Sequence, residues 1–289
     1  MSMDKKVKVI LDCDMAIGKF GSDIDDAFAY IWLKEETELL GITCVHGNAK
    51  ESKCFDTTVQ MTNLLNDDVG VYHGAGSKDS LGKKTDAVDF ICQTVKKYPE
   101  QVVIVAVGPL TNIASVALYD REAFNKIKKI VIMGGFDKDK PPFIKSEFNF
   151  IKSAKAAKIV CESDISKIFV PSDICLKLVF SKEDLKRLKI NNECAEFIKK
   201  STKSWMNLML LAGAFNILPK GGFVPWDPIA AAGLTHPDRF KCEKCTVTVD
   251  ENGVSHFYSD SNSNSIVLRD FDKKWFINEL IEKINQATN

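Results

Sequence analysis

A run of six apolar residues constrains the fold more than any other feature of this chain. Residues Val102–Val107 read VVIVAV, and most of them are β-branched. A half-buried strand alternates apolar and polar residues, so this run indicates a strand buried on both faces, as in a parallel sheet covered by helices. Gly108 and Pro109 then turn the chain, and either Thr111 or Pro109 is expected to open a helix.

Other strand signals alternate with helical signals along the first two thirds of the chain. Strands are expected within 7–11, 41–48, 69–72, 129–135 and 167–173, and helices within 51–65, 85–97 and 153–162. This alternation predicts an α/β fold with a doubly wound, mainly parallel sheet flanked by helices. The last third is more helical, with signals at 182–188, 194–211 and 271–284, and 245–268 is expected to hold an antiparallel pair. We expect residues 1–289 to form a single domain.

Carboxylates crowd the turn between the first strand and the first helix. Asp12 and Asp14 follow the strand, and Asp25 and Asp26 precede the helical pattern. Ligand sites of open α/β sheets lie at the carboxyl ends of strands. Like charges in one turn repel unless a cation or donor hydroxyl groups compensate them. A hard divalent cation is the natural partner, and several protein oxygens favour calcium over magnesium.

A simpler interpretation exists for each of these acids taken singly. Ser22 or Asp23 could cap the helix, and Asp25 and Asp26 could complement the helix dipole in its first turn. Later in the chain, Asp227 before Pro228 is typical of a helix cap followed by proline. Capping explains one acid at a time, whereas a ligand site explains why four gather after one strand.

The composition of the chain limits the kinds of partner that it is expected to bind. Lys+Arg and Asp+Glu are both 39, so the formal net charge is zero and no basic footprint for a nucleic-acid polymer or an anionic membrane is present. Nine cysteines, an odd number without a secretory leader, favour free thiols and a cytoplasmic location. Cys242 and Cys245 lack a second ligand pair for zinc and are expected in a strand. The expected partner is a small molecule.

With these residues in view, the chain resembles the inosine-uridine preferring nucleoside hydrolases over nearly its whole length. The resemblance rests on several motifs in order, which together are specific although none is so alone. They are LDCDMAIGKFGSDIDDA (11–27), GN (47–48), VGPLTNIA (107–114), IMGG (132–135), EFN (147–149) and WDPIAAA (226–232).

The resemblance implies roles for individual residues. Calcium would be held by Asp14, Asp26, Asp227 and the backbone carbonyl of Val107, with Asp14 also acting as the general base on water. Ribose hydroxyls would be bound by Asp25, Asn48, Glu147 and Asn149, with Asp12 in a supporting position. The implied activity is calcium-dependent hydrolysis of the N-glycosidic bond of ribonucleosides, in a homodimer or homotetramer. A role in purine salvage is inferred from that chemistry.

The sequence departs from the family where the leaving base is activated. Many relatives carry a histidine before the late Asp-Pro, but this chain has Trp226, which favours stacking on a purine. The family's His-Gly motif is replaced by 76–82. His46 and His73 could substitute for it, but a lone histidine after a strand is more often structural. The loop 136–146 lacks an asparagine offered to ribose in relatives. An insertion, residues 15–22, is expected to form a flap over the site.

Two other functions compete with a purine-preferring nucleoside hydrolase. A haloacid dehalogenase type phosphatase also places Asp-x-Asp after its first strand, but Ala16 stands where Thr or Val is usual, and this class explains neither EFN nor WDP. A catalytically impaired ribose-binding or nucleoside-binding protein would keep the metal and ribose groups after losing the proton donors.

Overall fold

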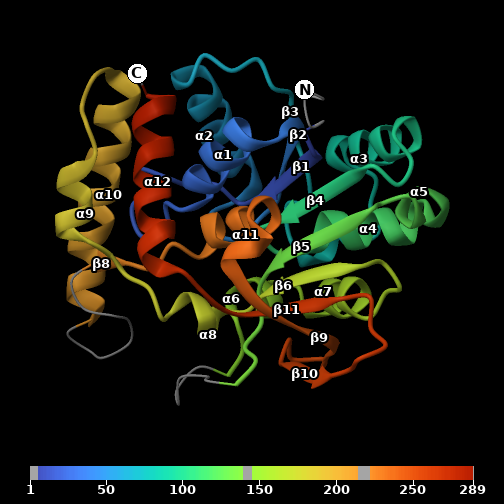
Figure 1. Cartoon of the computed structure of the whole chain (residues 1–289). Helices are drawn as coiled ribbons and strands as arrows, with labels where there is room; N and C mark the ends of the chain where they lie inside the picture. The colour runs from blue at the N-terminus through green and yellow to red at the C-terminus, as the bar shows by residue number, and fades with distance from the viewer. Residues whose placement is uncertain (1–5, 139–144, 214–221, 289) are drawn as a thin grey trace, which may run out of the picture.

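The computed structural model describes residues 6–138, 145–213 and 222–288. Within these ranges the centre is a nine-stranded sheet of order β10-β9-β11-β6-β5-β4-β1-β2-β3 (Figure 1). Its strands are β1 (Lys8–Cys13), β2 (Glu38–Cys44), β3 (Val71–Tyr72), β4 (Val102–Ala106), β5 (Lys129–Met133), β6 (Lys167–Val170), β9 (Phe240–Val249), β10 (Ser255–Ser259) and β11 (Ile266–Phe271).

Most strand pairs are parallel. Strands β1 to β6 and β11 run the same way, and in this sheet β9 pairs antiparallel with β11 and with β10. The order 3-2-1-4-5-6 reverses direction between β1 and β4, which makes these two strands the switch point of the sheet. The predicted doubly wound α/β fold is therefore confirmed.

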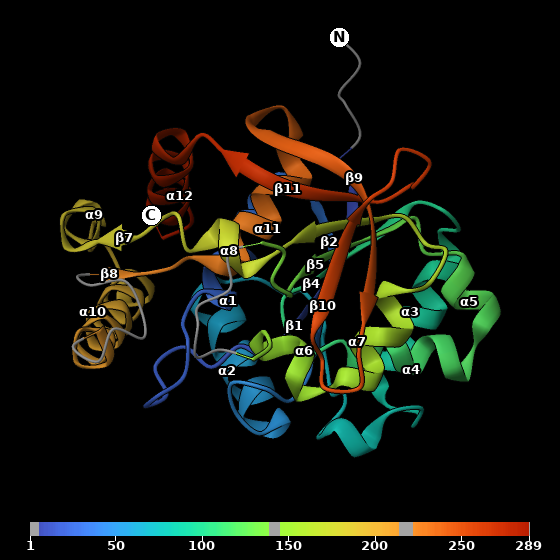
Figure 2. The same ribbon diagram turned by 90° about the horizontal axis from the view of Figure 1, so that it is seen from below.

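Helices cover both faces of the sheet (Figure 2). Strand β4 shows why: Val103 and Val105 join one buried cluster while Val102 and Ile104 join the other, so neither face of the strand meets water. The helices are α1 (Asp26–Glu36), α2 (Glu51–Leu64), α3 (Asp86–Lys97), α4 (Thr111–Tyr119), α5 (Arg121–Asn125), α6 (Phe148–Lys152), α7 (Ala154–Cys161), α8 (Ser172–Cys175), α9 (Lys182–Arg187), α10 (Glu193–Gly213), α11 (Trp226–Thr235) and α12 (Lys273–Ala287).

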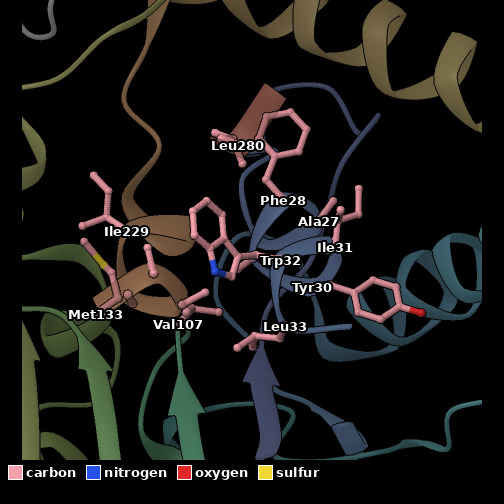
Figure 3. Close-up of a cluster of buried hydrophobic side chains, with 14 of the residues drawn as sticks. Ala27, Phe28, Tyr30, Ile31, Trp32, Leu33, Val107, Met133, Ile229 and Leu280 are labelled. Carbon is pink, nitrogen blue, oxygen red and sulfur yellow. The ribbon is translucent and has the colours of Figure 1, made fainter. Parts of the chain in front are cut away.

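One cluster joins the first helix to the last third of the chain. Helix α1 is buried from Asp26 to Leu33, and Trp32 stacks on Phe276 of α12 with ring centroids 5.5 Å apart. Figure 3 shows Val107 and Met133, near the ends of neighbouring strands, on the side of this cluster where Ile229 of α11 lies. Burial of α1 on several sides fixes its first turn against the carboxyl edge of the sheet.

Several expected boundaries moved by a few residues, and three short helices were missed. The strands expected to reach 135 and 173 end at Met133 and Val170, and α5, α6 and α8 were not predicted. The antiparallel pair around residues 252–253 is confirmed as β9 and β10. Cys242 and Cys245 both lie in β9, as expected. The remaining elements are the short strands β7 (Phe180–Ser181) and β8 (Gly222–Phe223) and two 3-10 turns, η1 (Lys78–Ser80) and η2 (Pro237–Arg239).

Candidate active site

The end of β1 and the first turn of α1 bring Asp14 and Asp26 together. The backbone N–H of Asp14 donates a hydrogen bond to Asp26 Oδ1 over 3.1 Å, and both residues are fully or almost fully buried. Asp25 is the residue that precedes α1, but its side chain makes no capping bond to that helix. The capping role considered for Ser22 or Asp23 is therefore wrong, whereas Asp26 does lie in the first turn.

Helix α11 adds Asp227 from the far end of the sequence. Its backbone N–H donates to Asp25 Oδ2 over 3.0 Å. Helix α11 begins at Trp226, with Pro225 before it, so Asp227 lies in the first turn and the predicted cap at Asp227 is wrong. Carboxylate oxygens of Asp25, Asp26 and Asp227 lie within 4.8 Å of one another. We call these three residues and Asp14 the acidic cluster.

Burial raises the pKa of each carboxyl group in the acidic cluster. For Asp14 the pKa rises to about 7, because burial removes water and the charge of Asp25 adds repulsion. For Asp26 and Asp227 the pKa lies well above its ordinary value, again through burial first and neighbouring carboxylates second. These groups cannot all ionise cheaply without a compensating positive charge. The donor set of clustered oxygens therefore suits a hard divalent cation.

A second group of site residues follows β4 and β5. The Val107 carbonyl accepts a hydrogen bond from Asn149 Nδ2 over 2.9 Å, and the same amide contacts the Met133 carbonyl at 3.2 Å. Glu147 precedes α6 and accepts backbone N–H bonds from Asn149 and Phe150. Burial raises the pKa of Glu147 to about 7. The EFN motif thus ties the ends of two strands to the first turn of α6.

Asn48 closes the site from the loop after β2. Its backbone N–H donates to Asp14 Oδ2 over 2.5 Å, and its Nδ2 lies 3.3 Å from Asp26 Oδ2. The preceding residue must be glycine, since a Cβ at Gly47 would stand 1.9 Å from Asp14 Oδ2. The GN motif therefore orients both carboxylates.

Asp12 lies beneath the site rather than in it. Its Oδ1 accepts bonds from Thr43 Oγ1 over 2.5 Å and from Asn112 Nδ2 over 2.7 Å. Asp12 is completely buried, and burial raises its pKa to about 6. Asn112 also receives the Ala75 N–H and donates to the Cys44 carbonyl. Asp12 thus joins β1 to β2 and α4 below Asp14.

A cavity of about 580 Å³ opens beside the acidic cluster. Asp14, Asp25, Asp227 and the residues of the GN and EFN motifs line one part of it. The rest includes a group of apolar side chains that we call the apolar wall, made of Phe136, Phe148, Ile151, Leu176, Trp205 and Trp226. Trp226, predicted to contact the base, is half-buried and lines the cavity next to Asp227.

The histidines do not line this cavity. His46 approaches Thr111 Oγ1 at 3.3 Å, and His73 stacks on Phe55 and pairs with Glu51 at the surface. His236 packs against Trp32. All four histidines of the chain lie in the described residues and none of them lines the cavity. The suggestion that His46 or His73 replaces the family's histidines gains no support.

The insertion at 15–22 borders the cavity only through its end. Met15, Ala16 and Ile17 are buried in the core, and a Cβ at Gly18 would touch Phe197 of α10. Gly21 lines the cavity, as does Asp23 just beyond the insertion. Phe20 is 95% exposed. The insertion therefore packs against α10, and the expected flap over the site is not seen.

Sequence reasoning missed many residues of the cavity lining, and Trp205, Leu176 and Lys152 illustrate why. Trp205 comes from α10, Leu176 from the turn after α8, and Lys152 from the end of α6. The first two belong to segments distant in sequence from every motif. A position of Lys152 near the cavity could have been predicted, because it stands one helical turn after Phe148 of EFN. That prediction required the short helix α6 to be recognised.

Comparisons with known proteins agree with this geometry. The family model for the inosine-uridine preferring nucleoside hydrolases matches residues 9–278. The pyrimidine-specific ribonucleoside hydrolase RihA of Escherichia fergusonii is 27% identical, over 96% of this chain and 97% of its own. RihA of Shewanella oneidensis is 26% identical, over 97% and 96%.

Solved structures show the same fold. A plant nucleoside hydrolase superposes with a TM-score of 0.84 at 20% identity, covering 97% of this chain and 99% of its own. A purine-preferring ribonucleoside hydrolase from Gardnerella vaginalis also gives 0.84, at 24% identity over the same shares. The fold and site thus define an α/β protein with a mainly parallel, doubly wound sheet and an acidic cluster at its carboxyl edge.

The chain belongs to the inosine-uridine preferring nucleoside hydrolase family. It is a nucleoside N-ribohydrolase, which splits the N-glycosidic bond of ribonucleosides. This membership sets aside the phosphatase alternative. Among the helices in the described ranges, none combines the length and the hydrophobicity needed to cross a membrane.

Proposed function

We propose that this enzyme hydrolyses ribonucleosides with the help of calcium and prefers purine nucleosides. The observation that carries the proposal is the acidic cluster beside a cavity that Trp226 also lines. Proposed metal ligands are Asp14, Asp26, Asp227 and the Val107 carbonyl. An all-oxygen set with several carboxylates favours calcium, which accepts more protein ligands than magnesium does.

The structure supports this ligand set in part. Asp26 and Asp227 belong to the tight group of carboxylates, whose third member is Asp25. Asp14 joins them through its own N–H to Asp26. The Val107 carbonyl accepts one bond, from Asn149, and a carbonyl oxygen has a second lone pair. When bound, calcium would supply positive charge that acidifies a water molecule and orients ribose hydroxyls.

The proposed catalytic roles follow from the contacts of the side chains in the site. Asp14 takes the proton of the attacking water, and the Asn48 N–H fixes the carboxylate in place for that transfer. Asp25, Asn48, Glu147 and Asn149 accept or donate bonds to ribose hydroxyls, which orients the anomeric carbon toward the water. The surrounding carboxylates favour the positive charge that develops on the ribosyl group as the bond to the base breaks.

Purine preference rests on Trp226. An indole offers a broad face for a two-ring base, and stacking contributes about 1–3 kcal/mol per base in other nucleic-acid complexes. The RihA relatives are described as pyrimidine-specific, whereas a solved structure of similar fold is described as purine-preferring. Base preference is therefore the part of the proposal that an assay must decide.

The test is release of free ribose from inosine, guanosine, adenosine, uridine and cytidine. Each nucleoside is assayed with calcium, with magnesium and after chelation. The expected result is turnover with calcium, highest for a purine nucleoside, and loss of turnover on chelation. Faster turnover of uridine would reject purine preference, and turnover insensitive to chelation would reject the metal.

A binding function is the second candidate, because no histidine lines the cavity to protonate the base. In that case calcium-dependent nucleoside affinity would persist while no ribose was released. Equilibrium dialysis of inosine, with and without calcium, separates the two functions in the same preparation. We rank hydrolysis first because the chain belongs to a hydrolase family and the proposed water-activating groups are present.

A further inference from the structure

Breaking the N-glycosidic bond leaves an electron pair on the base, which is a poor leaving group unless it accepts a proton or a strong hydrogen bond. None of the four histidines lines the cavity, as described above. The donor must therefore be sought among other side chains of the cavity.

Most donors around the cavity are already engaged. The amide of Asn149 donates to the carbonyls of Val107 and Met133, and that of Asn48 lies against Asp26. The hydroxyl of Ser146 donates to the Gly253 carbonyl. These groups hold the site together, so they are not available to a departing base.

Trp205 and Glu147 are also unsuited to the task. Trp205 Nε1 is buried and finds no hydrogen-bond partner among the described residues, and an indole N–H donates a hydrogen bond without giving up its proton. Both carboxylate oxygens of Glu147 accept backbone N–H bonds from the first turn of α6 and from Gly135. Although burial raises the pKa of Glu147 to about 7, these bonds occupy both of its oxygens, and Glu147 is the residue proposed to bind a ribose hydroxyl rather than the base.

Lys152 differs from every other described residue that lines the cavity, because it alone is cationic. It ends helix α6, one turn beyond Phe148, and its Nζ lies 4.9 Å from the centre of the Phe148 ring. A cation over an aromatic face is held by the ring quadrupole. The ammonium is thereby kept against the apolar wall, on the helix that Glu147 caps.

The electrostatics of the neighbourhood agree with this position. Burial lowers the pKa of His46, and the positive charge of Lys152 lowers it further. The charge of Lys152 thus affects the loop of His46. The same loop carries Asn48, which contacts Asp14. Its flexible stem gives the ammonium group reach into the cavity, and the residue is solvent-exposed, so a spent proton is replaced from water.

We propose that Lys152 is a catalytic residue that donates a hydrogen bond, and then a proton, to the departing base. The inference rests on the nucleoside hydrolase activity and deepens the proposed function by supplying its missing leaving-group donor. It holds for a purine or a pyrimidine, because both carry a ring nitrogen or carbonyl oxygen that accepts a proton.

The step balances as follows. The oxygen of water forms a bond to the anomeric carbon while the bond from that carbon to the base nitrogen breaks, and its electron pair goes to the base. One proton of the water passes to Asp14, and one proton of Lys152 Nζ passes to the base. Solvent then returns a proton to Lys152 and removes one from Asp14. No redox co-reactant is needed.

The experiment compares Lys152→Met with wild type on two substrates. One is whichever natural nucleoside the wild type turns over fastest, and the other is p-nitrophenyl riboside, whose leaving group needs no proton. We expect kcat on the nucleoside to fall about 100-fold, within the range of general acid catalysis, with KM changed less than about threefold. On p-nitrophenyl riboside kcat should fall less than about threefold.

Matched variants separate a proton donor from a structural residue. Lys155→Met removes a neighbouring exposed lysine that does not line the cavity, and it should change neither substrate. Lys152→Ala should regain nucleoside turnover when ethylamine is added, and the Lys155→Ala control should not respond. Calcium affinity, measured by calorimetry, should be the same in every variant.

The result of this experiment does not depend on base preference, because the natural nucleoside with the fastest turnover is used whatever its base. Unchanged nucleoside turnover in Lys152→Met would overturn the proposal. So would equal losses on the two substrates, which indicate a structural role. A wild type that cleaves p-nitrophenyl riboside but no nucleoside would show that no group activates a base, and would overturn it as well.

Discussion

The acidic cluster and the apolar wall meet in one cavity but are built in different ways. The cluster is fully or almost fully buried, and backbone N–H groups of Asp14, Asn48 and Asp227 fix its carboxylates. The wall comes from α6, α10, α11 and two loops, and its side chains range from half-buried to exposed. In the proposed function, the rigid cluster holds the sugar and the water, and the base meets the less buried wall.

The largest loss of activity is expected in the acidic cluster, at Asp14. Asp14→Asn removes the proton acceptor while keeping the shape of the side chain, so kcat for ribose release should fall about 10³-fold or more. Asp56→Asn, at an exposed position on α2, is the control. Residual activity within tenfold of wild type would mean that another group takes the proton.

Asp227 tests whether the cluster is a metal site. Asp227→Ala should weaken calcium binding about 100-fold or more, because affinity follows the number of charged ligands. Without metal, the variant should be as stable as wild type or more so, since a buried, repelled carboxylate is gone. Calorimetry and thermal unfolding measure the two quantities. Unchanged affinity would remove Asp227 from the ligand set.

Gly47 tests how rigid the acidic cluster is. Gly47→Ala places a Cβ 1.9 Å from Asp14 Oδ2, so the carboxylate must move. A displacement of about 1 Å from the reactive geometry costs roughly 100-fold in rate. Gly76→Ala, where a Cβ meets nothing within 4 Å, is the matched control. Equal kcat in both variants would show that Asp14 tolerates movement.

Trp226 tests the apolar wall. Trp226→Ala should lower kcat/KM for inosine about tenfold or more, from lost stacking. The loss should be smaller for uridine, whose base offers less area. Trp226→Phe keeps an aromatic face and should recover part of the activity. Equal losses on purine and pyrimidine nucleosides would contradict selective stacking.

The smallest expected effect is a dependence of stability on pH in the chelated enzyme. The pKa of Asp14 is raised to about 7 in the folded protein, above its value near 4 in the unfolded chain. The folded state therefore binds more protons between these values, and the free energy of unfolding falls as pH rises through that window. Calcium should remove this fall. Urea unfolding at pH 5 and pH 7.5 measures it.

Much of the fold was readable because the signals are local. The apolar run Val102–Val107 requires burial on both faces, and a strand with both faces buried belongs in a helix-covered sheet. The motifs also located the acidic cluster, because polar residues that follow parallel strands meet at one edge. The short helices α5, α6 and α8 were missed, since four or five residues carry too little periodicity to reveal a helix.

The sequence by itself determined the α/β class, the strand ends and the acids that gather there, since strand burial and strand direction are written in local patterns. Tertiary structure decided the rest. It brought Asp227 to Asp25 across 202 positions, packed the insertion against α10 rather than over the site, and set Lys152 and Trp205 in the cavity wall. Those placements depend on which helices share a core, which no single segment encodes.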